Sequence, residues 1–262
     1  MTKITKYFEE AAGKTLFSIE IIPPMKGQHL GELMSHIEPL MEFKPPFIEV
    51  TYHREEYIEK VVDGVSKRIP IRKRPGTLGI CASIMQKFHV EAVPHVICGG
   101  FTKEETEDFL IDLHYLGIEN ALILRGDQEK GEERFIPKPG GHAYANELVE
   151  QVKAMNQGIL LHEETESLPT NFCIGVAAYP EKHFEAVSLE EDMRFLKQKV
   201  DAGADYIVTQ MFFDNQKYFD FVAKCRQMDI HVPIIPGLKP LATARQLDIL
   251  PEIFHLEIPE IL

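Results

Sequence analysis

Residues 171–213 read NFCIGVAAYPEKHFEAVSLEEDMRFLKQKVDAGADYIVTQMFF, and this stretch decides the fold. It contains two short runs rich in β-branched and aromatic residues, Phe172–Ala178 and Tyr206–Phe212, which predict buried strands. Between them, Ser188 and Glu191 have the spacing of a helix N-terminus, and a glycine closes the helical segment. A strand, a helix and a second strand in this order favour two parallel strands joined by a crossover helix.

The same alternation extends along the whole chain. The other predicted strands are Leu16–Ile22, Phe47–Tyr52, Pro94–Cys98, Ala121–Leu124 and Val232–Pro236. Thr102 and Glu105 predict a capping box, and further helices are predicted after Asp214 and over Ala242–Leu250. A parallel barrel and a doubly wound sheet both fit this pattern. No G-x-G-x-x-G follows the first strand, and polar residues end many strands, so we predict an α/β fold of the (β/α)8 TIM barrel type.

Chain length agrees with a single barrel, because such a domain needs about 250 residues and this chain has 262. We therefore expect one domain over residues 1–262. Only seven strands are predicted, so the barrel is expected to lack its last strand–helix unit at the C-terminal end. A truncation and a partner chain that completes the barrel are both compatible with this count, and we favour a truncation.

Composition excludes several classes of partner and site. The formal net charge is −13, from 28 basic and 41 acidic side chains, which disfavours nucleic acid as a partner. The four cysteines are widely spaced and form no cluster with histidine, so no metal site is expected and the thiols are interpreted as reduced. Neither a signal peptide nor an apolar run long enough to cross a membrane is recognisable, which predicts a cytoplasmic protein without membrane contact.

The first strand carries a candidate acid, Glu20, within FSIEIIPP (residues 17–24). Since alternate residues of a strand point to opposite faces, Ser18 and Glu20 share the face opposite three apolar residues. We expect Glu20 to face the barrel interior, partly desolvated, with its pKa raised toward values useful for a general acid. A glutamate that is paired with a neighbouring lysine or arginine fits the same pattern.

Three further segments place polar groups at strand ends. ALILRGD (residues 121–127) ends in a turn where Arg125 is suited to a phosphate and Asp127 to a ring N–H; an ordinary turn closed by its own ion pair is the alternative. GVAAYPEKHFEA (residues 175–186) has small residues suited to a flat ligand or to a narrow barrel layer. Gln210 offers an amide donor and acceptor, or is a core residue, and His95 is by default a buried core histidine.

Taken together, these segments resemble the methylenetetrahydrofolate reductase family. The similarity runs from about Thr15 to about Pro240 and rests on the order of IEIIPP, VTYHREEY, PHVIC, LRGD, AAYPEKHFEA, KVDAGADYIVTQMFFD and VPIIPGL. The resemblance implies a non-covalently bound FAD, with NADH or NADPH as co-substrate. It also implies a ping-pong hydride transfer that reduces 5,10-methylenetetrahydrofolate to 5-methyltetrahydrofolate. We expect a homo-oligomer that binds these small molecules.

The resemblance also implies the roles of individual residues. Glu20 would be the general acid, Asp127 would lie near the flavin and the pterin as a catalytic and substrate-binding residue, and Gln210 would bind the substrates. The residues implied for FAD are Thr51, His95, Leu124, Arg125, Gly126, Asp127, Tyr144, Ala145, Tyr179, His183, Asp192 and Lys199. One departure stands out, because the family commonly has a small, glycine-rich run where this chain has residues 53–56, His-Arg-Glu-Glu.

Two other hypotheses remain open. A non-catalytic or partner-completed barrel subunit would keep the fold without turnover, although the joint presence of Glu20, Asp127 and Gln210 argues against it. A pterin-handling transferase of the same fold would bind no flavin, and the order of the motifs argues against that reading.

Overall fold

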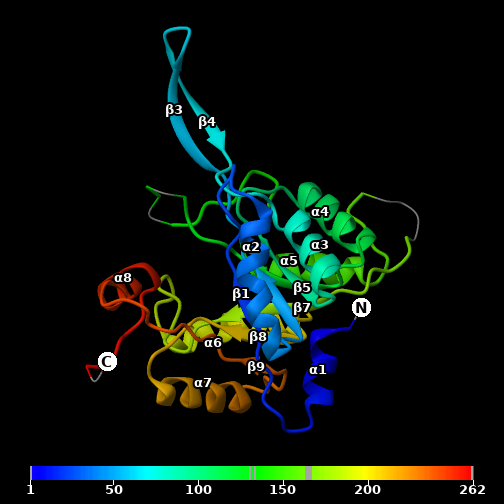
Figure 1. Ribbon diagram of the computed structural model, residues 1–262, viewed down its shortest axis with the longest axis vertical. Coiled ribbons are helices and arrows are strands. Elements are labelled where there is room, and N and C mark those ends of the chain that lie inside the picture. The colour runs from blue at the N-terminus through cyan, green and yellow to red at the C-terminus, as the bar shows by residue number, and fades with distance from the viewer. Residues whose placement is uncertain (1, 130, 133, 163–166, 261) are drawn as a thin grey trace. The chain divides into compact units, whose positions relative to one another are not determined.

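The computed structural model describes residues 2–129, 131–132, 134–162, 167–260 and 262. The chain divides into two compact units, residues 1–173 and 174–262, with the boundary at the beginning of a strand. Figure 1 shows the helices and strands of each unit.

The first unit contains four parallel strands in the order β1-β2-β5-β6. Their bounds are Ile19–Ile21 (β1), Phe47–Val50 (β2), Glu91–Ile97 (β5) and Asn120–Leu124 (β6). Every residue of β2 is buried, as expected for a parallel strand that is covered on both faces. In the register, Glu20 of β1 pairs with Glu49 of β2, and Val50 pairs with Pro94 of β5. β1 lies at the edge of this order.

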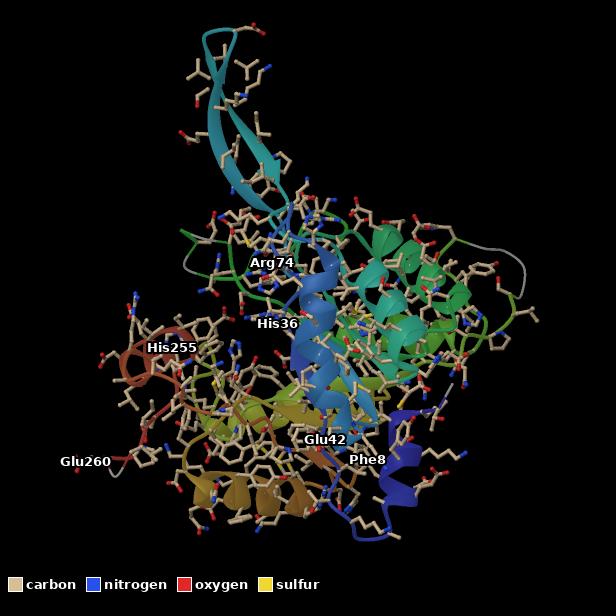
Figure 2. The ribbon with its side chains drawn as sticks, viewed as in Figure 1. Phe8, His36, Glu42, Arg74, His255 and Glu260 are labelled. Atoms are coloured by element: carbon tan, nitrogen blue, oxygen red, sulfur yellow. The ribbon has the colours of Figure 1, made fainter. Side chains whose placement is uncertain are left out.

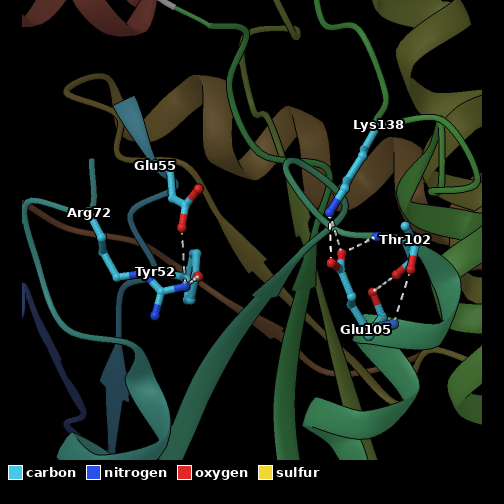
Figure 3. Close-up of polar contacts among 7 residues, drawn as sticks. Tyr52, Glu55, Arg72, Thr102, Glu105 and Lys138 are labelled. Carbon is cyan, nitrogen blue, oxygen red and sulfur yellow. Dashed lines mark hydrogen bonds and ion pairs between the residues drawn. The ribbon is translucent and has the colours of Figure 1, made fainter. Parts of the chain in front are cut away.

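The helices of the first unit join these strands. Their bounds are Ile4–Ala11 (α1), Leu30–Ile37 (α2), the 3-10 turn Glu38–Phe43 (η1), Thr77–Phe88 (α3), Lys103–Tyr115 (α4) and Ala145–Met155 (α5). The predicted capping box at α4 is confirmed, because the Glu105 N–H donates to the Thr102 hydroxyl and the Thr102 N–H donates to the Glu105 carboxylate (Figure 3). Lys138 also binds that carboxylate, at 2.7 Å.

A long antiparallel hairpin extends from the first unit (Figure 1) and lies outside all predicted elements. It comprises β3, Glu56–Val62, and β4, Val65–Ile71. Asp63 and Gly64 form its turn, both with positive φ, which is the conformation that a two-residue hairpin turn needs. The Asp-Gly pair between alternating strands is a strong hairpin signal. Arg74 marks the foot of this hairpin in Figure 2.

Polar contacts hold the base of the hairpin to the first unit. Arg72 donates to the Tyr52 hydroxyl at 3.3 Å and lies 3.8 Å from the Glu55 carboxylate (Figure 3). Arg54 and Arg68 both bind the Glu129 carboxylate. Most of the hairpin itself is exposed to solvent.

The second unit repeats the strand–helix pattern. Its strands β7 (Cys173–Ala178), β8 (Tyr206–Thr209) and β9 (Ile234–Ile235) are parallel and follow chain order. Its helices are α6 (Leu189–Asp201), α7 (Asn215–Gln227) and α8 (Arg245–Phe254). Ser188 caps α6 by accepting from the Glu191 N–H, while the Glu191 carboxylate accepts from the Val187 N–H.

All seven predicted strands are present as parallel strands, so the α/β class is confirmed. The fold is that of a TIM-type barrel with seven of its eight strands, because no eighth parallel strand occurs in the described part of the chain. Helix α8 begins and ends later than the predicted segment 242–250, and helices α1, α2, α3 and α5 lie outside the predicted elements. None of the helices that the structure describes has the length and apolar character that a membrane crossing requires.

Candidate functional site

The acidic side chain of β1 lies beside β2. The Thr51 hydroxyl, directly after β2, donates to the Glu20 carboxylate at 3.2 Å, and the Thr51 N–H donates to the Ile21 carbonyl at 3.0 Å. Glu20 is exposed, whereas the sequence predicted a partly desolvated side chain. The physical reason is that β1 is an edge strand of the first unit, so strand β2 covers Glu20 from one side.

A second glutamate, which the sequence analysis does not single out, is the buried member of this group. The carboxylates of Glu20 and Glu49 and the ring of His95 each place one polar atom within 4.8 Å of the others. Glu49 is 5% exposed and His95 is 4% exposed. One carboxylate oxygen of Glu49 and both ring nitrogens of His95 have no hydrogen-bond partner. Buried polar atoms without partners are rare and often belong to a ligand site.

Burial sets the protonation of both groups. Desolvation, followed by the nearby Glu20 carboxylate, raises the pKa of Glu49 to about 8. Desolvation, followed by the nearby His53 ring, lowers the pKa of His95 to about 3. At neutral pH the cluster therefore holds a protonated carboxyl at Glu49 and a neutral imidazole at His95.

The turn after β6 lies next to the end of β5. The Cys98 N–H donates to the Leu124 carbonyl at 3.1 Å, and the Gly99 N–H donates to the Arg125 carbonyl at 3.2 Å. Gly126 has a φ of +85°, which side chains rarely adopt, so a glycine is needed at this turn. The predicted RGD turn is therefore present.

The charged groups of this turn have different neighbours. The Arg125 guanidinium lies 5.0 Å from the centre of the Phe135 ring. Asp127 is exposed, and its backbone carbonyl accepts from Arg54 at 3.3 Å. Arg54 belongs to the segment 53–56, so this segment brings a cation to the turn.

Tyr144 and Ala145 lie at the beginning of α5, farther along the first unit. The Glu147 carboxylate accepts from the Ala143 N–H at 2.7 Å and from the Tyr144 N–H at 3.4 Å. Tyr144 is 57% exposed. Within the described residues, no hydrogen bond joins Tyr144 or Ala145 to another predicted site residue.

The second unit brings three of its predicted residues together after β7. The rings of Tyr179 and His183 meet edge to face, with centres 4.8 Å apart. The His183 N–H donates to the Asp192 carboxylate at 2.9 Å. Burial raises the pKa of Asp192, against the opposing effects of the His183 N–H and of Lys199.

Lys199 of α6 and Gln210, directly after β8, both donate to carbonyls of β7. The Lys199 ammonium donates to the Ala177 carbonyl of β7. The Gln210 N–H donates to the Ala178 carbonyl at 2.8 Å, and its side-chain oxygen accepts from the Met211 N–H at 2.9 Å. The amide NH2 of Gln210 makes no hydrogen bond among the described residues, so it is the group that remains for a ligand.

The small residues of β7 have a structural role as well. A Cβ added at Gly175 would lie 2.3 Å from the ring of Tyr206, which is completely buried on β8. Gly175 and Tyr206 are register partners in the parallel pair. The reading of this strand as a narrow barrel layer is therefore supported at Gly175.

Residues 3–262 match the family model described as methylenetetrahydrofolate reductase. A probable methylenetetrahydrofolate reductase (NADH) of Oryza sativa subsp. japonica is 32% identical over 250 residues, which are 91% of this chain and 38% of the relative. The 5,10-methylenetetrahydrofolate reductase of Escherichia coli strain K12 is 32% identical over 250 residues, 95% of this chain and 73% of that protein. The chain thus spans about two fifths of the length of the plant relative.

A solved structure shares the fold at low sequence identity. It is an uncharacterized protein from Clostridium thermocellum that binds two copies of 5-methyl-5,6,7,8-tetrahydrofolic acid. The TM-score is 0.60 at 13% identity, covering 98% of this chain and 77% of the other. This likeness supports the fold that the strand order shows.

Proposed function

Since the chain belongs to the methylenetetrahydrofolate reductase family, we propose that it reduces 5,10-methylenetetrahydrofolate to 5-methyltetrahydrofolate. NADH or NADPH is the electron donor and FAD is the bound cofactor, and the two substrates react in turn by a ping-pong hydride transfer. The observation that carries the proposal is the carboxyl cluster at the ends of β1 and β2, because this reduction needs an acid close to the substrate.

Glu20 is the proposed acid. It is exposed, so it is accessible to a substrate, and the Thr51 hydroxyl holds one of its oxygens at 3.2 Å. Donation of its proton to a ring nitrogen of methylenetetrahydrofolate would open the five-membered ring and give a substrate iminium that accepts a hydride. Asp127, which is exposed at the turn after β6, is the proposed second charge near the reacting rings.

One observation in the first unit supports a bound isoalloxazine there. His95 is buried and both of its ring nitrogens lack a hydrogen-bond partner, so they are polar atoms that a bound ring could satisfy. The proposed contacts in the first unit are Thr51, His95, Leu124, Arg125, Gly126, Asp127, Tyr144 and Ala145. Those in the second unit are Tyr179, His183, Asp192 and Lys199. When bound, FAD supplies the group that takes a hydride from one substrate and gives it to the other.

Gln210 is the proposed contact for both substrates. Its side-chain oxygen is already held by the Met211 N–H, which fixes the amide and directs the remaining NH2 group to a ligand. A residue that serves the nicotinamide and the folate in turn fits a reaction in which one leaves before the other enters. The rice relative is named as an NADH enzyme, which favours NADH as the donor.

Three further features belong to the proposal. A single domain over residues 1–262 is proposed. A homo-oligomer is proposed from the resemblance to the family. A cytoplasmic location is proposed because all four cysteines are free and buried, as is usual in a reducing compartment.

Absorption spectroscopy tests the proposal directly. The protein is incubated with FAD, desalted and made anaerobic, and its visible bands are followed. We expect bands that bleach with NADH and return when methylenetetrahydrofolate is added. A protein that stays colourless with FAD contradicts the flavin proposal, and bands that bleach but do not return contradict folate as the acceptor.

Variants separate the roles of the residues. Glu20→Gln is expected to abolish the folate half-reaction and leave the bleaching by NADH largely intact; equal loss of both contradicts its role as the acid. Asp127→Asn is expected to change the potential of the flavin as well as folate reduction. A Gln210→Leu variant should slow both half-reactions, and a defect limited to folate contradicts a shared contact.

A further inference from the structure

Two glutamates are direct neighbours on adjacent strands. Glu20 of β1 and Glu49 of β2 are register partners, and their carboxylate oxygens lie within 4.8 Å of each other. Like charges at facing positions of neighbouring strands disfavour each other. The geometry therefore resists a state in which both carboxyls are ionised.

Burial decides which of the two carboxyls keeps a proton. Glu20 is exposed, so water can stabilise its charge, whereas Glu49 is 5% exposed and one of its oxygens has no hydrogen-bond partner. No lysine or arginine among the described residues lies within ion-pair distance of Glu49. An unpaired charge is costly in such surroundings, so the buried carboxyl is the one that stays protonated.

The other groups around Glu49 do not supply a compensating charge. His95 of β5 is neutral because burial lowers its pKa to about 3, and burial also lowers the pKa of His53 after β2. Helix α3, which packs against β2, contributes the buried thiol of Cys81, whose pKa burial raises, so it is neutral as well. The Thr51 hydroxyl is directed to Glu20. Within the first unit, Glu20 is thus the charged group that affects the ionisation of Glu49.

We propose that Glu20 and Glu49 share one proton through neutral pH, and that Glu49 stores this proton for the acid Glu20. The inference rests on the proposed function and deepens it. The O–H of Glu49 first breaks as that of Glu20 forms, and the O–H of Glu20 then breaks as an N–H of the folate forms, so that the one proton of the pair passes to the substrate. The separation of the carboxyls is suited to transfer through one water molecule. Solvent then returns a proton to Glu49, so no other reactant is needed.

A divalent cation held by Glu20, Glu49 and His95 is the alternative occupant of the cluster. A histidine that binds a metal through one ring nitrogen nearly always donates the other ring N–H to a carboxylate, a carbonyl or a water. Both ring nitrogens of His95 lack a protein partner, so this support is missing. The proton-sharing pair therefore fits the geometry better than a metal site.

The test is the pH dependence of the folate half-reaction in Glu49→Gln. The amide keeps the size and neutrality of the protonated carboxyl but cannot give up a proton. In the wild type we expect the rate to fall above about pH 8. In Glu49→Gln the fall should begin at least about one pH unit lower, which makes the rate near pH 8 about tenfold lower than in the wild type. The half-reaction with NADH should not change.

Two further variants make this result specific. Glu49→Asp retains a carboxyl and should restore most of the rate near pH 8. Glu59→Gln on the exposed hairpin strand β3 also removes one carboxylate and should leave the profile as in the wild type. A profile that is unchanged in Glu49→Gln overturns the proposal, and so does a profile that shifts equally in Glu59→Gln.

Infrared spectroscopy tests the pair without any turnover. The wild type should show the C=O band of a protonated carboxylic acid that disappears near pH 8, and Glu49→Gln should lack it. If the wild type does not reduce the folate, the proposed function fails, while this band still decides on the pair. Absence of the band overturns the inference, as does a stoichiometric divalent metal that is present in the wild type and lost in Glu49→Gln.

Discussion

Removal of the buried carboxyl should change how the stability of the protein depends on pH. The pKa of Glu49 is raised from 4.5 to about 8 in the folded protein, so between these values the folded state binds a proton that the unfolded state has lost. Stability contributed by this site is therefore fully present below about pH 4.5 and falls as the pH rises to about 8. Glu49→Gln has no such proton and loses this dependence.

The size of the effect follows from the shift. Each unit of pKa shift corresponds to about 1.4 kcal/mol. A shift of roughly 3.5 units therefore changes the free energy of unfolding by at most about 5 kcal/mol between about pH 4.5 and about pH 8. We expect the free energy of unfolding of Glu49→Gln, relative to the wild type, to increase by at least about 2 kcal/mol from about pH 5 to about pH 9.

Urea unfolding followed by circular dichroism is the suitable assay, because the chain contains no tryptophan. Comparison of the two proteins at each pH cancels the contribution of the titrating groups that lie away from Glu49, and leaves that of Glu49 together with its close neighbours Glu20 and His95. A difference in unfolding free energy that stays constant over the whole range would refute the reasoning, since it would mean that Glu49 is ionised in the folded protein at neutral pH.

Four further substitutions have expected results. Gly175→Ala should destabilise the second unit by about 1–3 kcal/mol because its Cβ would lie 2.3 Å from a buried tyrosine ring; Gly79→Ala in α3, where the space is open, should stabilise by up to about 1 kcal/mol in thermal unfolding. Lys60→Glu should slow hydrogen exchange in the hairpin, because Lys60 faces Lys67 in the register. Thr102→Ala should cost about 1 kcal/mol through loss of the α4 cap, and an unchanged melting temperature would contradict the role of that cap.

Local sequence patterns determined the order of the seven parallel strands and the N-terminal caps of α4 and α6. A buried parallel strand needs apolar residues on both faces, so each of the seven strands is recognisable without its neighbours. Thr102 and Ser188 cap their helices through residues three positions away, which is also a local property. A local signal of this kind also occurs at Asp63 and Gly64, because an Asp-Gly pair between two strand-like runs predicts a hairpin turn.

The sequence also identified Glu20, Thr51 and His95 as candidates, but not the arrangement that relates them. Only the register places Glu49 beside Glu20, and only the edge position of β1 leaves Glu20 exposed while Glu49 is buried. Glu49 looks like an ordinary strand residue in the sequence because its neighbours on the chain, Ile48 and Val50, are apolar core residues. Protonation depends on distance and solvent access, and both are set by strands that are far apart in the sequence, so the tertiary structure alone decided where the proton is held.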